Sequence, residues 1–86
     1  MYKVVLTEKA EEFYQKLLYA DKSIFERIRR ALKSLSQNPF RGKPLKDDLK
    51  GKFSLRVGVY RIIYSVYRDK VLVVVFDIGH RRDIYQ

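Results

Sequence analysis

Three cationic side chains in the second half of the chain have the spacing needed to hold an anion together. Lys52 and Arg56 lie in the β-type run of residues 52–57, and Arg61 follows in the next run, residues 60–67. Side chains alternate between the two faces of a strand, so we expect all three to project from one face of the paired runs, unless a one-residue bulge shifts the alternation. Three cations on one face repel one another unless an anion joins them. The pattern therefore indicates an anion-binding face.

The chain contains one histidine and no cysteine, which limits the chemistry it can perform. An imidazole titrates near neutral pH, so His80 is the natural acid or base of this sequence. Disulfides, cysteine nucleophiles, thiolate metal sites and metal sites built from several histidines are all excluded.

Positive charge is concentrated after the first quarter of the chain. The sequence has 19 Lys and Arg against 10 Asp and Glu, a net charge of +9 and an isoelectric point near 9.9. Residues 1–21 hold three bases and four acids, whereas residues 41–61 alone hold seven bases and two acids. A small domain with this gradient favours an anionic partner, such as nucleic acid, a membrane surface or an acidic protein segment.

Hydrophobic periodicity predicts the elements that position these residues. Residues 2–6 are predicted to form a strand, and Thr7 to cap a first helix. A second helix is predicted to begin at Ser23, with Glu26 completing a capping box, and to end at residues 38–39. The segments that follow are a loop at 39–51, strands at 52–57, 60–67 and 71–78, and a tail at 80–86 that either pairs as a short strand or lies across the sheet.

The order β-α-α-β-β-β predicts an α+β fold in one domain, residues 1–86, with a helical hairpin packed on one face of a small, mainly antiparallel sheet. The longest apolar run, residues 71–76, is far shorter than a membrane-spanning helix, and the first residues lack the apolar stretch of a signal peptide, so we expect a cytoplasmic protein with no membrane partner. The side chains expected to face the helices are Phe53, Leu55, Val57, Ile62, Tyr64 and Val66.

Nearly the whole chain resembles toxins of the RelE/ParE superfamily. The resemblance lies in residues 50–64, KGKFSLRVGVYRIIY, in the preceding segments 38–39 and 42–46, and in residues 79–85, GHRRDIY. Within that superfamily the chain looks closer to the RelE mRNA interferases than to the ParE gyrase poisons.

The resemblance implies the toxin of a type II toxin–antitoxin system, silenced by an acidic, RelB-like antitoxin. Such toxins cut mRNA in the ribosomal A site without a metal or cofactor, because the ribose 2′-OH attacks the adjacent phosphate. The implied partners are therefore the antitoxin, mRNA, ribosomal RNA and, only through the antitoxin complex, operator DNA.

The resemblance also implies roles for individual residues. Arg61 and Arg81 would brace the scissile phosphate, Tyr85 would stack on a base or transfer a proton, and His80 is a candidate base. A second lysine found in the best-known relatives is replaced here by Ser54, so their general base cannot be carried over. The positions expected to contact RNA are Lys52, Arg56, Lys50, Lys46, Lys43 and Arg82.

Two further surfaces have open interpretations. The basic side chains of the second helix, Lys22, Arg27, Arg29, Arg30 and Lys33, fit contact with ribosomal RNA and equally fit a solvated helix face. The apolar side chains of Phe40, Leu45 and Ile84 are candidates for docking the antitoxin. Two alternative functions also stay open: a gyrase-inhibiting toxin without nuclease activity, and an inactive module that binds its antitoxin and operator DNA.

Overall fold

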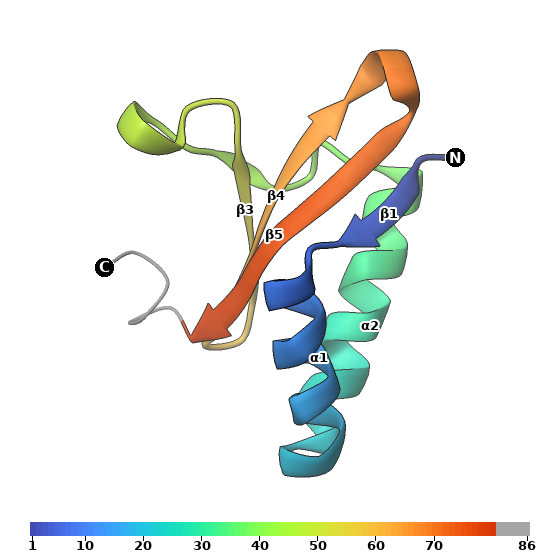
Figure 1. Cartoon of the computed structure of the whole chain (residues 1–86), viewed down its shortest axis with the longest axis vertical. Coiled ribbons are helices and arrows are strands. Elements are labelled where there is room, and N and C mark those ends of the chain that lie inside the picture. The colour runs from blue at the N-terminus through green and yellow to red at the C-terminus, as the bar shows by residue number, and fades with distance from the viewer. Residues whose placement is uncertain (81–86) are drawn as a thin grey trace.

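The computed structural model of the protein describes residues 1–80, which form a five-stranded sheet with two helices on one face (Figure 1). The strand order is β1-β5-β4-β3-β2, with β1 parallel to β5 and every other pair antiparallel. The elements are β1 (Lys3–Leu6), α1 (Glu8–Ala20), α2 (Lys22–Gln37), β2 (Lys43–Pro44), the 3-10 turn η1 (Asp47–Leu49), β3 (Phe53–Val57), β4 (Tyr60–Tyr67), the 3-10 turn η2 (Arg68–Lys70) and β5 (Leu72–His80).

The α+β architecture with a helical hairpin and a mainly antiparallel sheet is confirmed. Within the segment predicted to be a loop, the structure adds the two-residue strand β2 and the turn η1. Neither helix in residues 1–80 is both long and apolar enough to cross a membrane.

The two helices are joined through a single residue. The hydroxyl of Thr7 accepts a hydrogen bond from the N–H of Ala10 at 3.3 Å, so the predicted first cap is confirmed. The prediction of Ser23 as the second cap is wrong: the Asp21 carboxylate accepts from the N–H of Ile24 at 3.2 Å, and α2 already starts at Lys22. Asp21 also closes α1, since its N–H donates to the Leu17 carbonyl. One capping residue thus serves both helices, and Ser23 is left inside α2.

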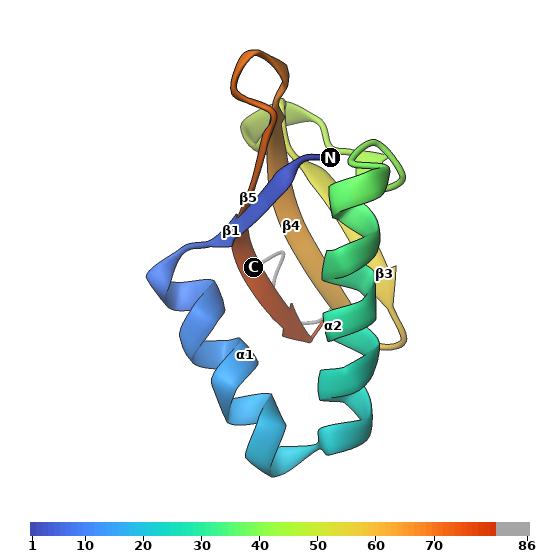
Figure 2. The same ribbon diagram turned by 90° about the vertical axis from the view of Figure 1, so that its right-hand side faces the viewer.

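The core lies between the helix pair and one face of the sheet. Figure 2 shows α1 and α2 side by side in front of the strands. Ile28 and Leu35 of α2 are fully buried, as are Ile62 of β4 and Val73 and Val75 of β5. The strand residues predicted to face the helices belong to this cluster or pack against it, so the predicted assignment of faces on β3 and β4 is confirmed.

A buried tyrosine ties β4 to the beginning of β2. Tyr64 is fully buried, and its hydroxyl accepts a hydrogen bond from the N–H of Gly42 at 2.9 Å. Burial raises the pKa of Tyr64 above its ordinary value of 10.0, an effect that the hydrogen bond from Gly42 and the charge of Arg41 oppose. A Cβ on Gly42 would lie 2.5 Å from the Tyr64 hydroxyl, so only glycine fits beside this side chain. The segment that leads into β2 is therefore held against the sheet.

We expect Tyr64→Phe to lower the free energy of unfolding by about 1–3 kcal/mol, because the buried N–H of Gly42 loses its acceptor. The midpoint of thermal unfolding should then fall by roughly 4–8 °C for each kcal/mol in a domain of this size. Tyr67→Phe is the matched control, since Tyr67 lies on the same strand but is exposed. Equal effects of the two substitutions on thermal or urea unfolding would contradict the proposed role of the Tyr64 hydroxyl.

Candidate functional site

The turn between β3 and β4 sets two arginines directly opposite each other. Gly58 and Val59 form a two-residue turn, and Gly58 has a φ of 61°, which suits the first position of a type II′ turn. The turn pairs Val57 with Tyr60 and, one step further, Arg56 with Arg61. Directly opposed like charges in an antiparallel pair destabilise the sheet. The backbone register thus sets the two arginines side by side on neighbouring strands.

Both arginines project from the face of the sheet that the helices leave open. Arg56 is exposed, and its Nε donates to the Gly58 carbonyl at 3.1 Å. Arg61 is half-buried on the neighbouring strand. The prediction that these two side chains share the open face is confirmed by the register, because their neighbours Val57 and Ile62 belong to the core on the opposite face.

Lys52 completes this face at the opposite end of β3. Its side chain is half-buried, and its ammonium nitrogen lies 4.8 Å from the centroid of the Phe76 ring on β5. This cation–π contact was not predicted, because nothing in the sequence indicates that residues 52 and 76 meet across β4.

The floor of the open face is uncharged. Ser54 and Ile63 pair across β3 and β4 and are both buried, and the Ser65 hydroxyl donates to the Gly51 carbonyl at 3.3 Å. Ser54 is thus a short, buried side chain in this floor.

The three other predicted contact lysines that the structure describes come from the segment before β3. Lys43 is the register partner of Ser54, so it extends the cationic row on the same face. Lys46 and Lys50 flank the turn η1 and are exposed. The only carboxylate in β3, β4 and β5 is Asp77, and it forms an ion pair with Lys9 at 3.1 Å. In the described part of the chain no cluster of acidic residues or histidine is arranged to hold a metal ion.

His80 lies on the other side of the sheet from the two arginines. It is the register partner of Tyr60, and the two rings meet at 5.9 Å in an edge-on contact. The Tyr60 ring in turn lies 6.0 Å from the ring of Phe13 on α1. The structure therefore does not bring His80 together with Arg61.

An extra residue in β5 explains the position of His80. The register shifts between Ile63 and Tyr64, whose partners are Asp77 and Val75, so Phe76 has no partner and forms a bulge. Beyond a bulge every side chain of a strand changes face. The sequence allowed for such a shift but did not locate it.

The remaining predicted site residues, Arg81, Arg82 and Tyr85, lie outside the described residues, as does the candidate docking residue Ile84. They follow directly on β5, whose penultimate residue, Gly79, is the register partner of Arg61. The last two described residues of β5, Gly79 and His80, lie opposite Arg61 and Tyr60.

Comparisons with known proteins agree with the fold. Residues 4–85 match the family described as the ParE toxin of type II toxin–antitoxin systems, parDE. The toxin RelG of Mycobacterium tuberculosis is 44% identical over 57 residues. The match covers 65% of this chain and 66% of RelG, so this chain spans just under two thirds of the length of RelG. The toxin YoeB of Streptomyces coelicolor is 29% identical over 77 residues, which is 84% of this chain and 92% of that protein.

Solved structures share the whole fold. The toxin–antitoxin complex RelBE2 of Mycobacterium tuberculosis contains a chain of 34% identity with a TM-score of 0.82, and the match covers 93% of this chain and 98% of that one. The YoeB/ParE toxin of Agrobacterium tumefaciens has 25% identity and a TM-score of 0.82, and the match covers 91% of this chain and 96% of that one. At 23% identity the intact RelBE complex of E. coli shares the fold alone, with a TM-score of 0.71 and coverage of 93% and 96%.

We expect Arg56→Gln to raise the free energy of unfolding by about 0.2–1 kcal/mol at low salt, because it removes a like charge directly opposite Arg61. The gain should shrink between about 0.01 M and about 1 M salt, since the Debye length falls from about 30 Å to about 3 Å. Urea unfolding at both salt concentrations measures this difference. Lys16→Gln, an exposed position on α1, removes the same charge and should show no such gain. A destabilised Arg56→Gln protein would contradict the repulsion.

Proposed function

The chain belongs to the ParE toxin family of type II toxin–antitoxin systems, and from this premise we propose that it is an endoribonuclease that cuts mRNA in the ribosomal A site. The observation that carries the proposal is the direct opposition of Arg56 and Arg61 on the open face of the sheet. A register that holds two guanidinium groups against their own repulsion is useful to a protein that must bind a phosphate between them.

The proposed reaction uses the substrate's own nucleophile. The ribose 2′-oxygen attacks the adjacent phosphorus while its proton passes to a base, and the bond to the 5′-oxygen breaks as that oxygen receives a proton. The products are a 2′,3′-cyclic phosphate and a 5′-hydroxyl. Negative charge builds on the phosphorane oxygens in the transition state, so cations already positioned around the phosphate stabilise the transition state most.

We assign the charge-stabilising role to Arg61, with Arg56 and Lys52 holding the RNA backbone on either side. Two further roles in the proposal come from the sequence. Arg81 would be a second phosphate ligand, and Tyr85 would donate a proton to the leaving 5′-oxygen. His80 is not assigned to the phosphate site, because its ring would first have to leave its contact with Tyr60.

The remaining lysines fit a role in docking. Lys43, Lys46 and Lys50, with Arg82 from the C-terminal segment, would contact the phosphates of mRNA and ribosomal RNA, which supply most of the affinity in such complexes. An acidic, RelB-like antitoxin would silence the toxin, and operator DNA would be bound only through that complex. A toxin that acts on ribosomes works in the cytoplasm, where we therefore place it.

We expect Arg61→Ala to lower the rate of mRNA cleavage about one hundredfold to one thousandfold, the usual cost of removing one group that stabilises a developing oxyanion. Primer extension on mRNA in programmed ribosomes measures the cleavage. Lys16→Gln, which removes one exposed positive charge from α1, should cleave at the unchanged rate. Full activity in a folded Arg61→Ala protein would remove Arg61 from the site.

We expect His80→Gln to lower the same rate less than about tenfold, because general acid–base catalysis contributes about 10²- to 10⁴-fold and His80 faces the helix side of the sheet. The measurement is again primer extension, made over a range of pH. A loss as large as that of Arg61→Ala would contradict this expectation and show that the ring moves into the site during the reaction.

A second candidate, inhibition of gyrase, is favoured by the match of residues 4–85 to ParE toxins. It differs from the first in what expression of the toxin does to the cell. A gyrase inhibitor would leave mRNA intact and induce the DNA-damage response, whereas the proposed nuclease would cut translated mRNA. Growth that continues unchanged would instead indicate an inactive module that binds antitoxin and operator DNA.

A further inference from the structure

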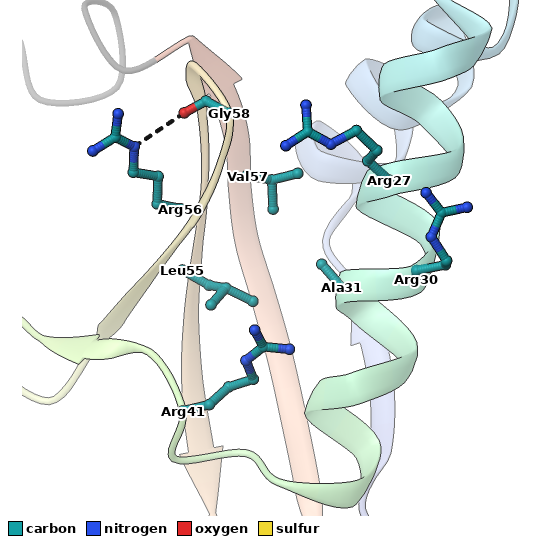
Figure 3. A pocket seen from close by; sticks show the side chains of 8 residues that line it. All are labelled: Arg27, Arg30, Ala31, Arg41, Leu55, Arg56, Val57 and Gly58. Carbon is teal, nitrogen blue, oxygen red and sulfur yellow. Dashed lines mark hydrogen bonds between the residues drawn. The ribbon is translucent and has the colours of Figure 1, made fainter.

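A groove of about 290 Å³ lies between α2 and the outer edge of β3, and the Arg56 side chain turns away from it (Figure 3). Its lining is Arg27, Arg30, Ala31, Arg41, Leu55, Arg56, Val57 and Gly58. Figure 3 shows Arg27 reaching from α2 toward one end of the groove, beside the β3–β4 turn, and Arg41 reaching into the other end from the segment before β2. Small-molecule sites begin at about 300 Å³, so the groove has room for one compact ligand.

The groove is strongly cationic and is lined by no carboxylate. Both ion pairs within residues 1–80 involve other side chains, so Arg27, Arg30 and Arg41 are not neutralised there. Arg27 and Arg30 are three residues apart on α2 and therefore lie on the same side of the helix. Arg41 donates through Nη1 to the Ser34 hydroxyl at 2.6 Å, which orients its guanidinium group but leaves its charge. Three guanidinium groups around one groove favour an anion with more than one charge.

One wall of the groove is apolar. It is formed by Ala31 of α2 and by Leu55 and Val57 of β3, and each of these residues is at most 9% exposed. A bare phosphate placed against this wall would find no hydrogen-bond donor there. A flat ring would instead remove apolar surface from water, which is favourable. The groove therefore suits a ligand that combines an anionic group with a flat, largely apolar body.

The edge of β3 adds one backbone donor and one backbone acceptor to the groove. Strand β2 pairs only with the first two residues of β3, so among the described strands none pairs with the outer edge of residues 55–57. The Lys52 carbonyl accepts from the N–H of Leu45 on the β2 side. Peptide groups of a strand alternate in direction, so the N–H and C=O of Arg56 point to the same outer edge. A nucleotide offers partners to both, because its phosphate oxygens accept and its ribose hydroxyls donate.

We propose that the groove is a binding site for a mononucleotide, in which a terminal phosphate lies between Arg27 and Arg30 and the base lies along the apolar wall. At the other end of the groove, the donors of Arg41 that do not bind Ser34 match the two acceptors, O6 and N7, on one edge of guanine. A terminal phosphate carries up to two negative charges, whereas each phosphate inside an RNA chain carries one. The groove therefore favours a free nucleotide over an RNA strand. This inference does not depend on the proposed nuclease activity.

Arg27 connects the groove to the turn between β3 and β4. A Cβ on Gly58 would lie 3.2 Å from Nη1 of Arg27 and 3.6 Å from Nη2, so the guanidinium group lies directly against the turn. A phosphate held by Arg27 is therefore close to the turn whose register sets Arg56 opposite Arg61. Occupation of the groove should be visible in the amide signal of Gly58.

The test titrates guanosine 5′-monophosphate into the purified protein and follows binding by NMR, where the amide signals of Val57 and Gly58 should shift together and saturate. Arg27→Gln and Arg41→Gln should each weaken binding about threefold to tenfold, because each substitution removes a charged donor to the ligand. The matched control is Arg29→Gln, which removes the same charge from α2 at a position that does not line the groove. It should change the affinity less than about twofold.

Three related ligands test the parts of the proposed nucleotide separately. Guanosine, which lacks the phosphate, and inorganic phosphate, which lacks the base, should each bind at least about tenfold more weakly than the nucleotide. The methyl ester of the nucleotide carries a phosphodiester with one charge fewer, and it should bind at least about threefold more weakly. Equal binding of inorganic phosphate, equal binding of the methyl ester, or absence of nucleotide binding would each overturn the proposal.

A further variant separates the groove from the open face, where a phosphate could also bind. Arg61→Ala should leave the affinity for the nucleotide unchanged, because Arg61 does not line the groove. Loss of binding in Arg61→Ala, with full binding in Arg27→Gln, would place the nucleotide on the open face and refute the proposal. Ribosomes and mRNA are absent from this experiment, so a protein that fails to cleave mRNA still tests the groove, and a protein that cleaves mRNA without binding the nucleotide refutes the groove alone.

Discussion

The two-residue turn at Gly58 and Val59 is the constraint on which the rest of the site depends. A turn of this length fixes the register of β3 and β4, and the register in turn sets Arg56 opposite Arg61. Longer or looser turns would let the strands slip by one residue, which would send one arginine to the core face. The positive φ of Gly58 is therefore part of the site, although the residue carries no chemistry of its own.

The fold and the faces of β3 and β4 could be predicted because they depend on local patterns. The apolar residues at helical spacing in α2 and the alternating residues of β3 predict which side chains are buried. The structure confirms burial of Ile28, Leu35, Leu55 and Val57. The cap of α2 was missed for a local reason: Asp21 serves both helices, and a pattern search that assumes a longer connection selects Ser23 instead.

The position of His80 and the arginine groove could not be predicted, because both depend on long-range packing. His80 faces the helices because of the bulge at Phe76, and that bulge ends a run of apolar residues, 72–76, whose pattern does not show where the alternation shifts. The groove brings together Arg27, Arg41 and Val57, which meet only when α2 packs beside the edge of β3. The density of positive charge in the sequence indicated all of these basic segments, but it did not show which of them share a surface in the folded protein.

Arg56 links the open face and the groove. Its side chain belongs to the open face opposite Arg61, while its peptide group belongs to the edge that borders the groove. An anion bound between Arg56 and Arg61 would relieve the repulsion expected between them, so a register that is expected to weaken the free protein would favour binding.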